Sequence, residues 1–168
     1  LSLHQLLTHT GGITHKTGDD YESLTLPDLI KRLNAQPLQY ELGSHHYSNL
    51  SYSLLAAVIE KASGQSYEKF LHQTFFKPLG MEHTGYLLPK FTDNEVANGY
   101  SQKGNWGQSH QKNWSHDGPY WNLRGNGGIL STVSDMAKWL KGLHGDKVFN
   151  NTEKKEYFGR YVREYPEM

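Results

Sequence analysis

Residues 49–62 carry the strongest structural signal in the chain, because their apolar side chains recur with helical spacing. Neighbours along one stripe are three or four residues apart, which is the spacing of a single helix face. The stripe consists of Leu50, Leu54, Leu55, Val58, Ile59 and Ala62. Gly64 follows and supplies a C-terminal stop, since glycine readily adopts the backbone conformation that ends helices. The sequence therefore predicts an amphipathic helix over residues 49–62.

Capping residues and apolar spacing predict four further helices. Ser66 is a good N-cap for a helix that ends before Pro78, and this helix would form a hairpin with the first one. Thr25 and Pro27 mark the start of another helix. The four helices are expected around Leu3–Leu7, closed by Gly11-Gly12, and near residues 26–34, 66–77 and 133–143. The tail from residue 150 to 168 is a candidate for one more.

The predicted helix near residues 133–143 has two candidate caps and a clear apolar stripe. Either Ser131 or Ser134 can serve as its N-cap, and Gly145 lies past its end. Its stripe comprises Val133, Met136, Ala137, Leu140 and Leu143. A stripe of this kind normally faces the core of a domain.

Between residues 92 and 128 the helical pattern dissolves into Gly, Asn, Ser, His and Trp. Short strands are expected only around Val96–Tyr100 and Ile129–Leu130. A loop of this length inside a compact domain is usually either functional or poorly ordered.

Length and composition exclude several classes of function. A chain of 168 residues fits one domain, and its 17 Lys and Arg balance its 17 Asp and Glu. This balance gives no net field for nucleic acid or an anionic membrane surface. The longest apolar run, residues 54–59, is far shorter than the roughly 18 residues of a membrane span. The absence of cysteine excludes disulfides and thiol nucleophiles.

The tripeptide Tyr47-Ser48-Asn49 stands directly before the best predicted helix. Side chains there lie at the positive end of the helix dipole, which favours ionisation of a phenol. A phenolate can accept a proton from a serine hydroxyl, and an Asn amide can both donate to and accept from a substrate amide or a lysine. The alternative is structural, with Tyr47 packing and Asn49 capping the helix.

Three blocks of the chain resemble the β-lactamase-related serine hydrolases of class C type. Residues 1–12, LSLHQLLTHTGG, look like the family segment ITIRHLLTHTSG. Residues 46–86 contain Tyr-Ser-Asn, two predicted helices and PLGMEHTG in the family's order. Residues 125–137 are similar to the family pattern GAGGLxSTxxDMA. The three blocks cover most of the chain to about Phe149.

The resemblance implies a fold and a site. The fold would be mainly α, the helical lobe of the β-lactamase/transpeptidase-like α/β fold with most of the sheet missing. Residues 1–168 would then form a single partial domain that includes the long polar and aromatic loop region 92–128. In the family, a Ser-x-x-Lys serine attacks a carbonyl, and the lysine and the Tyr-x-Asn tyrosine move its proton. Only the Tyr-x-Asn element matches here, so we expect Tyr47 to be catalytic and Asn49 to be catalytic and substrate-binding in a longer parent protein.

Apparent copies of the missing motifs are better explained by structure. Residues 66–69 read Ser-x-x-Lys at a helix start, but they follow Tyr47 and match an ordinary stretch of the family, so Ser66 is interpreted as a cap. Residues 109–112 read Ser-x-x-Lys within a polar loop. Lys16-Thr17-Gly18 precedes every other motif, whereas the family places Lys-Thr-Gly last. We expect none of the three to be catalytic.

Histidines, glycines and loop aromatics allow other interpretations. The 10 histidines show no metal-binding helical spacing, so solvated or capping roles and no metal are expected. The glycines of residues 125–128 lack the Lys-Ser/Thr of a phosphate loop and suit close backbone packing. Loop aromatics either line a substrate groove or cover the helices, with Trp121 the candidate for substrate contact. They are Trp106, Trp114, Tyr120 and Trp121.

By resemblance, the parent protein is expected to be a serine acyl hydrolase that works through an acyl-enzyme without a cofactor. Its substrate would be a small molecule or peptide: a β-lactam, a D-Ala-D-Ala peptide or an ester. The chain itself is expected to be inactive, and the parent to be an exported bacterial protein. One alternative is a non-catalytic module that binds peptide or cell-wall pieces, and a weaker one is a histidine metal protein.

Overall fold

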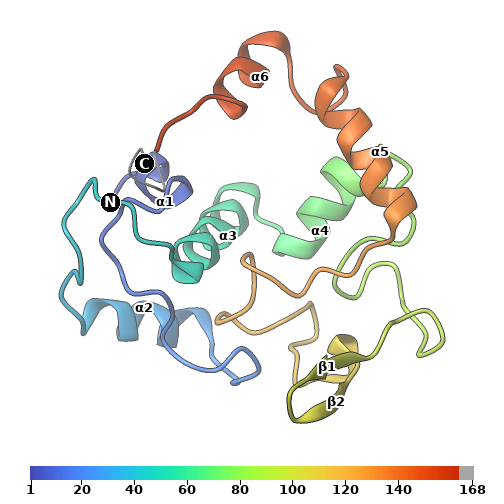
Figure 1. The fold of residues 1–168 in the computed structure, drawn as a ribbon, viewed down its shortest axis with the longest axis horizontal. Coiled ribbons are helices and arrows are strands. Elements are labelled where there is room, and N and C mark those ends of the chain that lie inside the picture. Colours follow the sequence, from blue (N-terminus) through green and yellow to red (C-terminus); the bar gives the residue numbers. More distant parts are fainter. Residues whose placement is uncertain (163–168) are drawn as a thin grey trace.

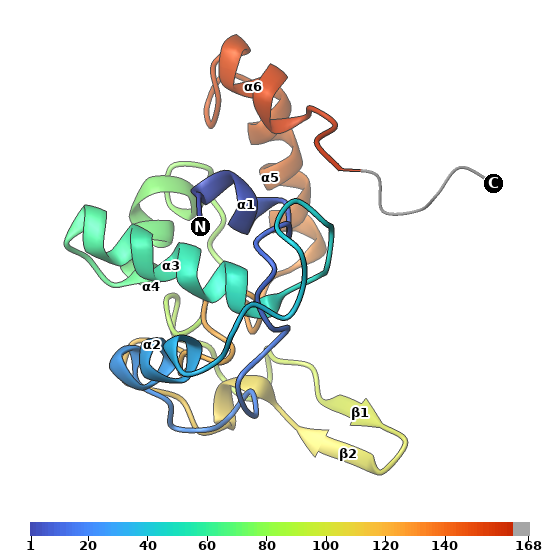
Figure 2. The same ribbon diagram turned by 90° about the vertical axis from the view of Figure 1, so that its left-hand side faces the viewer.

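The computed structural model describes residues 1–162, and within them helices surround a central helix, α3. The α-helices are α1 (Leu3–Leu7), α2 (Leu26–Asn34), α3 (Asn49–Ser63), α4 (Tyr67–Leu71), α5 (Val133–His144) and α6 (Asn151–Tyr157). Helix α3 packs against α1 and α4, while α5 and α6 occupy one edge of the molecule (Figure 1). The hairpin of β1 (Gly99–Ser101) and β2 (Gly104–Gly107) projects from the opposite side (Figure 2).

The hydrophobic core lies between α1, α2 and α3. Leucines from all three helices meet there with residues of the loops, and Leu29 of α2 is completely buried. The buried members are Leu6, Ile13, Leu24, Leu29, Leu50, Leu54, Ala56 and Trp121. Only part of the stripe predicted on α3 enters this core, because Val58 is 42% exposed. The buried side of α3 instead includes Ser51 and Ser53, which the apolar pattern did not mark.

The predicted capping signals are found on α2, α3 and α4, whereas α1 ends at Leu7 with Thr8 as C-cap, ahead of the predicted stop at Gly11-Gly12. Thr25 caps α2 through its hydroxyl, and Pro27 lies in the first turn, as expected. Gly64 ends α3 with φ +68, the left-handed conformation for which glycine is suited. Ser66 caps α4, which continues as a π-helical segment, His72–Phe76, up to Lys77. The helical hairpin of α3 and α4 is thereby confirmed.

The cap and the buried face predicted for α5 were both wrong. The N-cap is Thr132, whose hydroxyl accepts a hydrogen bond from the Asp135 backbone N–H at 3.2 Å. Ser131 instead shares a hydrogen bond with Thr84, at 2.8 Å. Val133 is 90% exposed, and only Leu143 of the predicted apolar stripe is buried. The middle of the helix also contacts the rest of the chain, since the Trp139 ring lies 5.9 Å from that of Phe75 and Lys138 donates to the Gly80 carbonyl. Most of the apolar stripe is nevertheless left uncovered by residues 1–162.

Strand structure within the described residues differs from the two predicted segments. Strand β1 overlaps the predicted strand near residue 100, but its antiparallel partner β2 was not expected. Leu130 forms only an isolated antiparallel bridge with Gly85. Two exchanged backbone hydrogen bonds, at 3.0 and 2.9 Å, nevertheless tie residues 85 and 130 together. This bridge joins the segment after α4 to the segment before α5.

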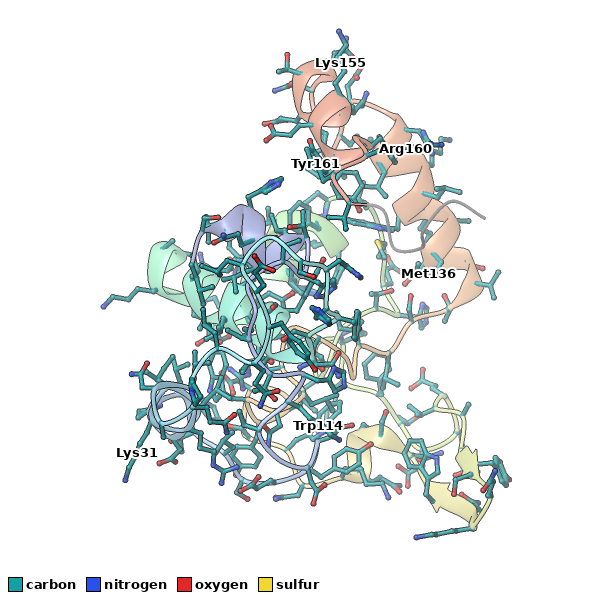
Figure 3. All side chains as sticks on the ribbon, turned by 60° about the vertical axis from the view of Figure 1, so that its left-hand side comes forward. Lys31, Trp114, Met136, Lys155, Arg160 and Tyr161 are labelled. Carbon is teal, nitrogen blue, oxygen red and sulfur yellow. The ribbon has the colours of Figure 1, made fainter. Side chains whose placement is uncertain are left out.

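Helical segments make up 38% of the structure and the sheet has two strands, so the prediction of a mainly α chain is not confirmed. Much of the remainder is loop that passes between the helices and the hairpin (Figure 2). Trp114 of this loop region is half-buried near the middle of the view, whereas Lys31 on α2 and Lys155 on α6 point outward at opposite ends (Figure 3).

Candidate active site

The tripeptide Tyr47-Ser48-Asn49 forms the start of α3, as the sequence predicts. Ser48 is the N-cap, and its hydroxyl accepts a hydrogen bond from the Ser51 backbone N–H at 3.1 Å. The same hydroxyl donates to the Thr14 carbonyl at 2.8 Å, and Ser48 is 1% exposed. Capping is therefore the work of Ser48, not of Asn49 as the structural alternative supposed. Asn49 is the first residue inside the helix.

The side chains of Tyr47 and Asn49, on either side of Ser48, take no part in capping the helix, and the Tyr47 ring contacts those of His9 and His15. Tyr47 is 59% exposed, and no residue among 1–162 makes a hydrogen bond to its phenol. The side-chain amide of Asn49 likewise has no hydrogen-bond partner within residues 1–162. Both groups lie at the N-terminal end of a 15-residue helix, where the dipole favours negative charge. Phenol and amide are thus presented together beside a fixed backbone.

Two other tyrosines, Tyr52 and Tyr86, have structural hydrogen bonds and are poor candidates for accepting a proton. The Tyr52 hydroxyl donates to the Leu7 carbonyl at 3.1 Å, and burial raises the pKa of Tyr52, with the phenols of Tyr157 and Tyr47 adding to the increase. Burial also raises the pKa of Tyr86, whose hydroxyl accepts a hydrogen bond from the Gly125 N–H at 3.0 Å. Of these three phenols, only that of Tyr47 lies open at a helix start.

The first sequence block wraps around the Tyr47–Asn49 turn. The backbone N–H of Ser48 donates to Nδ1 of His9 at 3.1 Å, and the N–H of Leu50 donates to the His15 carbonyl at 3.0 Å. The Tyr47 ring lies between these two histidines, with ring centroids 4.5 Å from His9 and 5.6 Å from His15. Residues almost 40 positions apart in the sequence therefore fix the helix start.

The glycine-rich block packs against the same helix, three to seven residues further along. A Cβ atom on Gly125 would come within 2.6 Å of the Tyr52 carbonyl oxygen and the Ala56 Cβ, and Gly125 has φ +86. Asn126 donates from its amide to the Ser53 hydroxyl at 2.8 Å. Close backbone approach is thus the structural use of Gly125, in agreement with the interpretation from sequence.

Trp121, the candidate for substrate contact, lies in the hydrophobic core and is 7% exposed. Its backbone N–H donates to the Leu24 carbonyl at 3.2 Å, and the Arg124 guanidinium lies 5.0 Å from its ring centroid. This placement favours the packing interpretation of Trp121. The ring of Trp114 contacts Tyr86, with centroids 5.9 Å apart, whereas Trp106 is 39% exposed on the hairpin.

The apparent copies of the family's other motifs have local structural roles. The Ser66 hydroxyl accepts from the Lys69 backbone N–H, so it caps α4 as expected. The Lys112 side chain donates to the Trp106 carbonyl, so it is bound to strand β2 of the hairpin. Thr17 donates from its hydroxyl to the Asn122 side chain at 3.1 Å.

Metal binding finds no geometric support among residues 1–162, where no three His, Cys, Asp or Glu side chains gather in a way that could hold an ion. His46 stacks on Tyr40, with ring centroids 3.8 Å apart, and His110 pairs with Asp93 at 3.0 Å. His9 is a functional candidate that the sequence interpretation missed, since it was grouped with solvated and capping histidines. Its position in the recognised block LLTHTGG was the available signal.

The chain belongs to the beta-lactamase family, whose sequence model matches residues 1–165. A putative penicillin-binding protein, PbpX, of Bacillus subtilis (strain 168) is 31% identical over 163 residues, which cover 94% of this chain and 39% of that protein. A putative D-alanyl-D-alanine carboxypeptidase of Escherichia coli (strain K12) is 30% identical over 156 residues, covering 78% of this chain and 34% of that protein. The chain thus spans between a third and two fifths of these relatives.

Solved structures share the fold. The penicillin binding protein from Bacillus halodurans superposes with a TM-score of 0.76 at 25% identity, covering 97% of this chain and 52% of that one. The D-amino acid amidase from Ochrobactrum anthropi SV3 superposes with a TM-score of 0.70 at 24% identity, covering 93% and 46%, and shows likeness of fold alone. The architecture is therefore that of the β-lactamase/transpeptidase-like fold.

Among the helices of residues 1–162, none combines the length and the apolar character needed to cross a membrane.

Proposed function

We propose that this chain carries the Tyr-x-Asn wall of the active site of a serine acyl hydrolase. In this proposal Tyr47 accepts and then returns a proton, and Asn49 orients the amide of the substrate. The observation that carries the proposal is that the three residues of the tripeptide have different structural roles. Within the tripeptide the Ser48 side chain anchors the turn, while the phenol of Tyr47 and the amide of Asn49 remain available at the N-terminus of α3.

Acylation in the proposed reaction has two proton transfers, and hydrolysis of the acyl-enzyme repeats them. The Tyr47 oxygen, as phenolate, takes the proton of a serine hydroxyl while the serine oxygen bonds to the substrate carbonyl carbon. The carbonyl then re-forms as the bond to the leaving amine breaks, and the phenol returns its proton to that nitrogen. A water molecule later repeats the sequence on the serine ester, releasing the carboxylic acid and the free serine. Asn49 would hold the substrate by accepting from its N–H and donating to its carbonyl.

We further propose that the nucleophilic serine and its lysine come from residues outside this sequence. The local roles of Ser66 and Lys112 support this, since a capping hydroxyl and a lysine bound to a carbonyl oxygen are poorly placed for attack. The names of the relatives favour a D-Ala-D-Ala peptide as the first substrate to test, before β-lactams and simple esters. A cell-envelope location for the complete protein is part of the proposal and rests on those names alone.

The role of Tyr47 is tested in the full-length reading frame with Tyr47→Phe. We expect kcat/KM for a D-Ala-D-Ala peptide or a chromogenic ester to fall by about 10²- to 10⁴-fold, the usual contribution of a positioned proton-transfer group. The thermal midpoint should not change, because the phenol makes no hydrogen bond to residues 1–162. Tyr100→Phe is the matched control, since Tyr100 is 71% exposed on the hairpin. Unchanged turnover in Tyr47→Phe would overturn the assignment.

The proposal that the chain alone cannot be acylated is tested with a fluorescent penicillin and a fluorophosphonate. The 168-residue chain should show no covalent adduct by mass spectrometry, whereas the full-length protein should show one per chain. A stoichiometric adduct on Ser66 or Ser109 of the chain would refute this. Reversible binding of a D-Ala-D-Ala peptide by a full-length protein that shows neither adduct nor turnover would support a non-catalytic binding module instead.

A further inference from the structure

His9 has an unusual backbone conformation for its residue type. Among residues 1–162 it is the only non-glycine residue with a positive φ, at +57. This left-handed region is unfavourable for residues that carry a Cβ, so the surrounding structure has to hold His9 there. The conformation places both the backbone carbonyl and the side chain of His9 beside the segment that leads into α3.

Two hydrogen bonds join His9 to that segment. The His46 backbone N–H donates to the His9 carbonyl at 2.9 Å, and the Ser48 backbone N–H donates to Nδ1 of the His9 ring at 3.1 Å. The two donors are two residues apart in an extended stretch, so they face the same side. Tyr47, which lies between them in sequence, is thereby fixed on both flanks.

The hydrogen bond from Ser48 also defines the protonation state of His9. A backbone N–H can only donate, so Nδ1 must present a lone pair, and the ring proton resides on Nε2. The neutral ring lies against the Tyr47 ring, with centroids 4.5 Å apart, and 5.1 Å from the Tyr52 ring. Since the Tyr52 hydroxyl is bound to the Leu7 carbonyl, the His9 ring is held from α1 and α3 together.

We propose that His9 is a positioning residue for Tyr47, acting through the Nδ1 hydrogen bond to the Ser48 N–H. This bond fixes the turn from which the Tyr47 phenol and the Asn49 amide project. His9 does not itself touch the reacting atoms in this proposal. The inference rests on the proposed function of Tyr47, but the contact on which it depends can be measured without any activity.

Three substitutions at His9 distinguish the contributions of the Nδ1 hydrogen bond, of the aromatic ring and of the strained backbone. His9→Asn keeps an acceptor atom at the δ position and a residue that tolerates positive φ, but removes the ring. His9→Phe keeps a ring and removes the acceptor. His9→Gly relieves the backbone and removes both. The proposal requires the Asn variant to resemble the wild type, and the Phe and Gly variants to share the same defect.

The contact is tested in the full-length protein by ¹⁵N NMR. His9 Nδ1 should show the shift of an unprotonated, hydrogen-bonded nitrogen near neutral pH, and the Ser48 amide should exchange slowly with solvent. Its exchange should accelerate about tenfold or more in His9→Phe and His9→Gly but not in His9→Asn, as expected when a local protecting bond is lost. A proton on Nδ1 in the wild type, or a Ser48 amide indifferent to all three changes, would overturn the inference.

The consequence is tested in the full-length enzyme. His9→Phe and His9→Gly should lower kcat by about 10- to 100-fold, the loss expected from a misplaced catalytic group, with KM nearly unchanged. His9→Asn should restore most of kcat. A fall in thermal stability with intact kcat would reduce His9 to a structural residue and refute the proposal. If Tyr47→Phe also retains full kcat, the proposed function is at fault. If only Tyr47→Phe is inactive, the inference on His9 alone fails.

Discussion

The carboxylate of Asp135 lies at the start of α5, and this residue has no exposed surface. Oxygen Oδ2 accepts from the His83 backbone N–H at 2.7 Å and from the Thr84 hydroxyl at 3.0 Å, and Oδ1 pairs with Lys138 at 2.8 Å. Burial by itself would raise the pKa of Asp135, but the bonds from Lys138, His83 and Thr84 outweigh it and hold the pKa below its usual value. This one side chain ties α5 to the segment after α4.

The Asp135→Asn variant should be less stable by about 2 kcal/mol near neutral pH, since charge-assisted bonds are lost. A depressed pKa contributes stability above the unfolded-state pKa, and that contribution disappears as the pH falls through the folded-state pKa. The difference between wild type and variant should therefore shrink below about pH 4. Urea unfolding at several pH values measures it. Asp146→Asn, at an exposed pair with Lys154, is the control and should change little.

The pKa of Glu68 is shifted in the opposite direction, above its usual value. Its Oε1 accepts from the backbone N–H groups of Tyr86, Leu87 and Leu88, and it is 4% exposed. Burial raises the pKa of Glu68 more than these three bonds lower it. The folded state therefore binds this proton more tightly than the unfolded state, and the associated stability is lost as the pH rises through the folded-state pKa.

Glu68→Gln should thus gain stability relative to the wild type as the pH increases above about 4, because the amide keeps an acceptor but carries no charge. Parallel urea titrations of both proteins between pH 4 and 8 give the difference. A difference that is constant with pH would contradict a raised pKa. Glu68→Ala, which leaves three buried N–H groups without an acceptor, should be much less stable than either at every pH.

At the scale of the element, substitutions at Thr132 and Ser134 can distinguish the N-cap of α5 found in the structure from one predicted from sequence. Three hydroxyl residues stand in the sequence where a helix begins, and each can cap by composition alone. Thr132→Ala should lower the free energy of unfolding by about 1 kcal/mol, the usual cost of removing an N-cap. Ser134→Ala should leave it unchanged or slightly higher, because Ser134 lies within the first turn. A larger loss of unfolding free energy in Ser134→Ala than in Thr132→Ala would instead support Ser134, one of the two N-caps predicted from sequence.

The two ends of the apolar stripe on α5 should respond differently to substitution. Leu143 is 6% exposed and Leu140 is 57% exposed. Leu143→Ala should cost about 2 to 5 kcal/mol through lost burial and a cavity, whereas Leu140→Gln should stay within about 0.5 kcal/mol in this chain. Chemical denaturation of both variants provides the comparison. Equal losses would mean that Leu140 is covered in solution by something other than residues 1–162.

At the scale of the whole molecule, the Arg124 side chain joins segments that are far apart in the sequence. Its guanidinium pairs with Glu60 of α3 at 2.8 Å and with Asp117 at 2.5 Å, and the side chain is 5% exposed. Its Nε donates to the Pro119 carbonyl at 2.9 Å. Arg124 follows Trp121 in the loop that leads to the glycine-rich block, so the ion pairs hold that block against α3.

Arg124→Met should destabilise the chain by about 3 kcal/mol, because it leaves two largely buried carboxylates without their cation. Asp117→Asn combined with Arg124→Met should cost less than the sum of the single changes, since both remove the same interaction. Arg32→Met is the control, because its pair with Glu22 lies nearer the surface. Additive losses in the double variant would show that the pair does not act as a unit.

The sequence by itself determined the features that depend on neighbours within about four residues. Caps, glycine stops and apolar spacing placed α2, α3 and α4, and the run of motifs identified the family and put Tyr47 and Asn49 at a helix start. These signals are local, because an N-cap or a helix face is defined by the i+3 and i+4 neighbours.

Only the tertiary structure decided features that depend on distant partners. It chose Ser48 and Thr132 as caps, buried Trp121, and left most of the α5 stripe uncovered by residues 1–162. It also brought Nδ1 of His9 to the Ser48 backbone N–H, through a hydrogen bond that spans 39 positions. Several residues at each place satisfy the local rules equally well, so the choice falls to contacts between segments that meet only when the chain is folded.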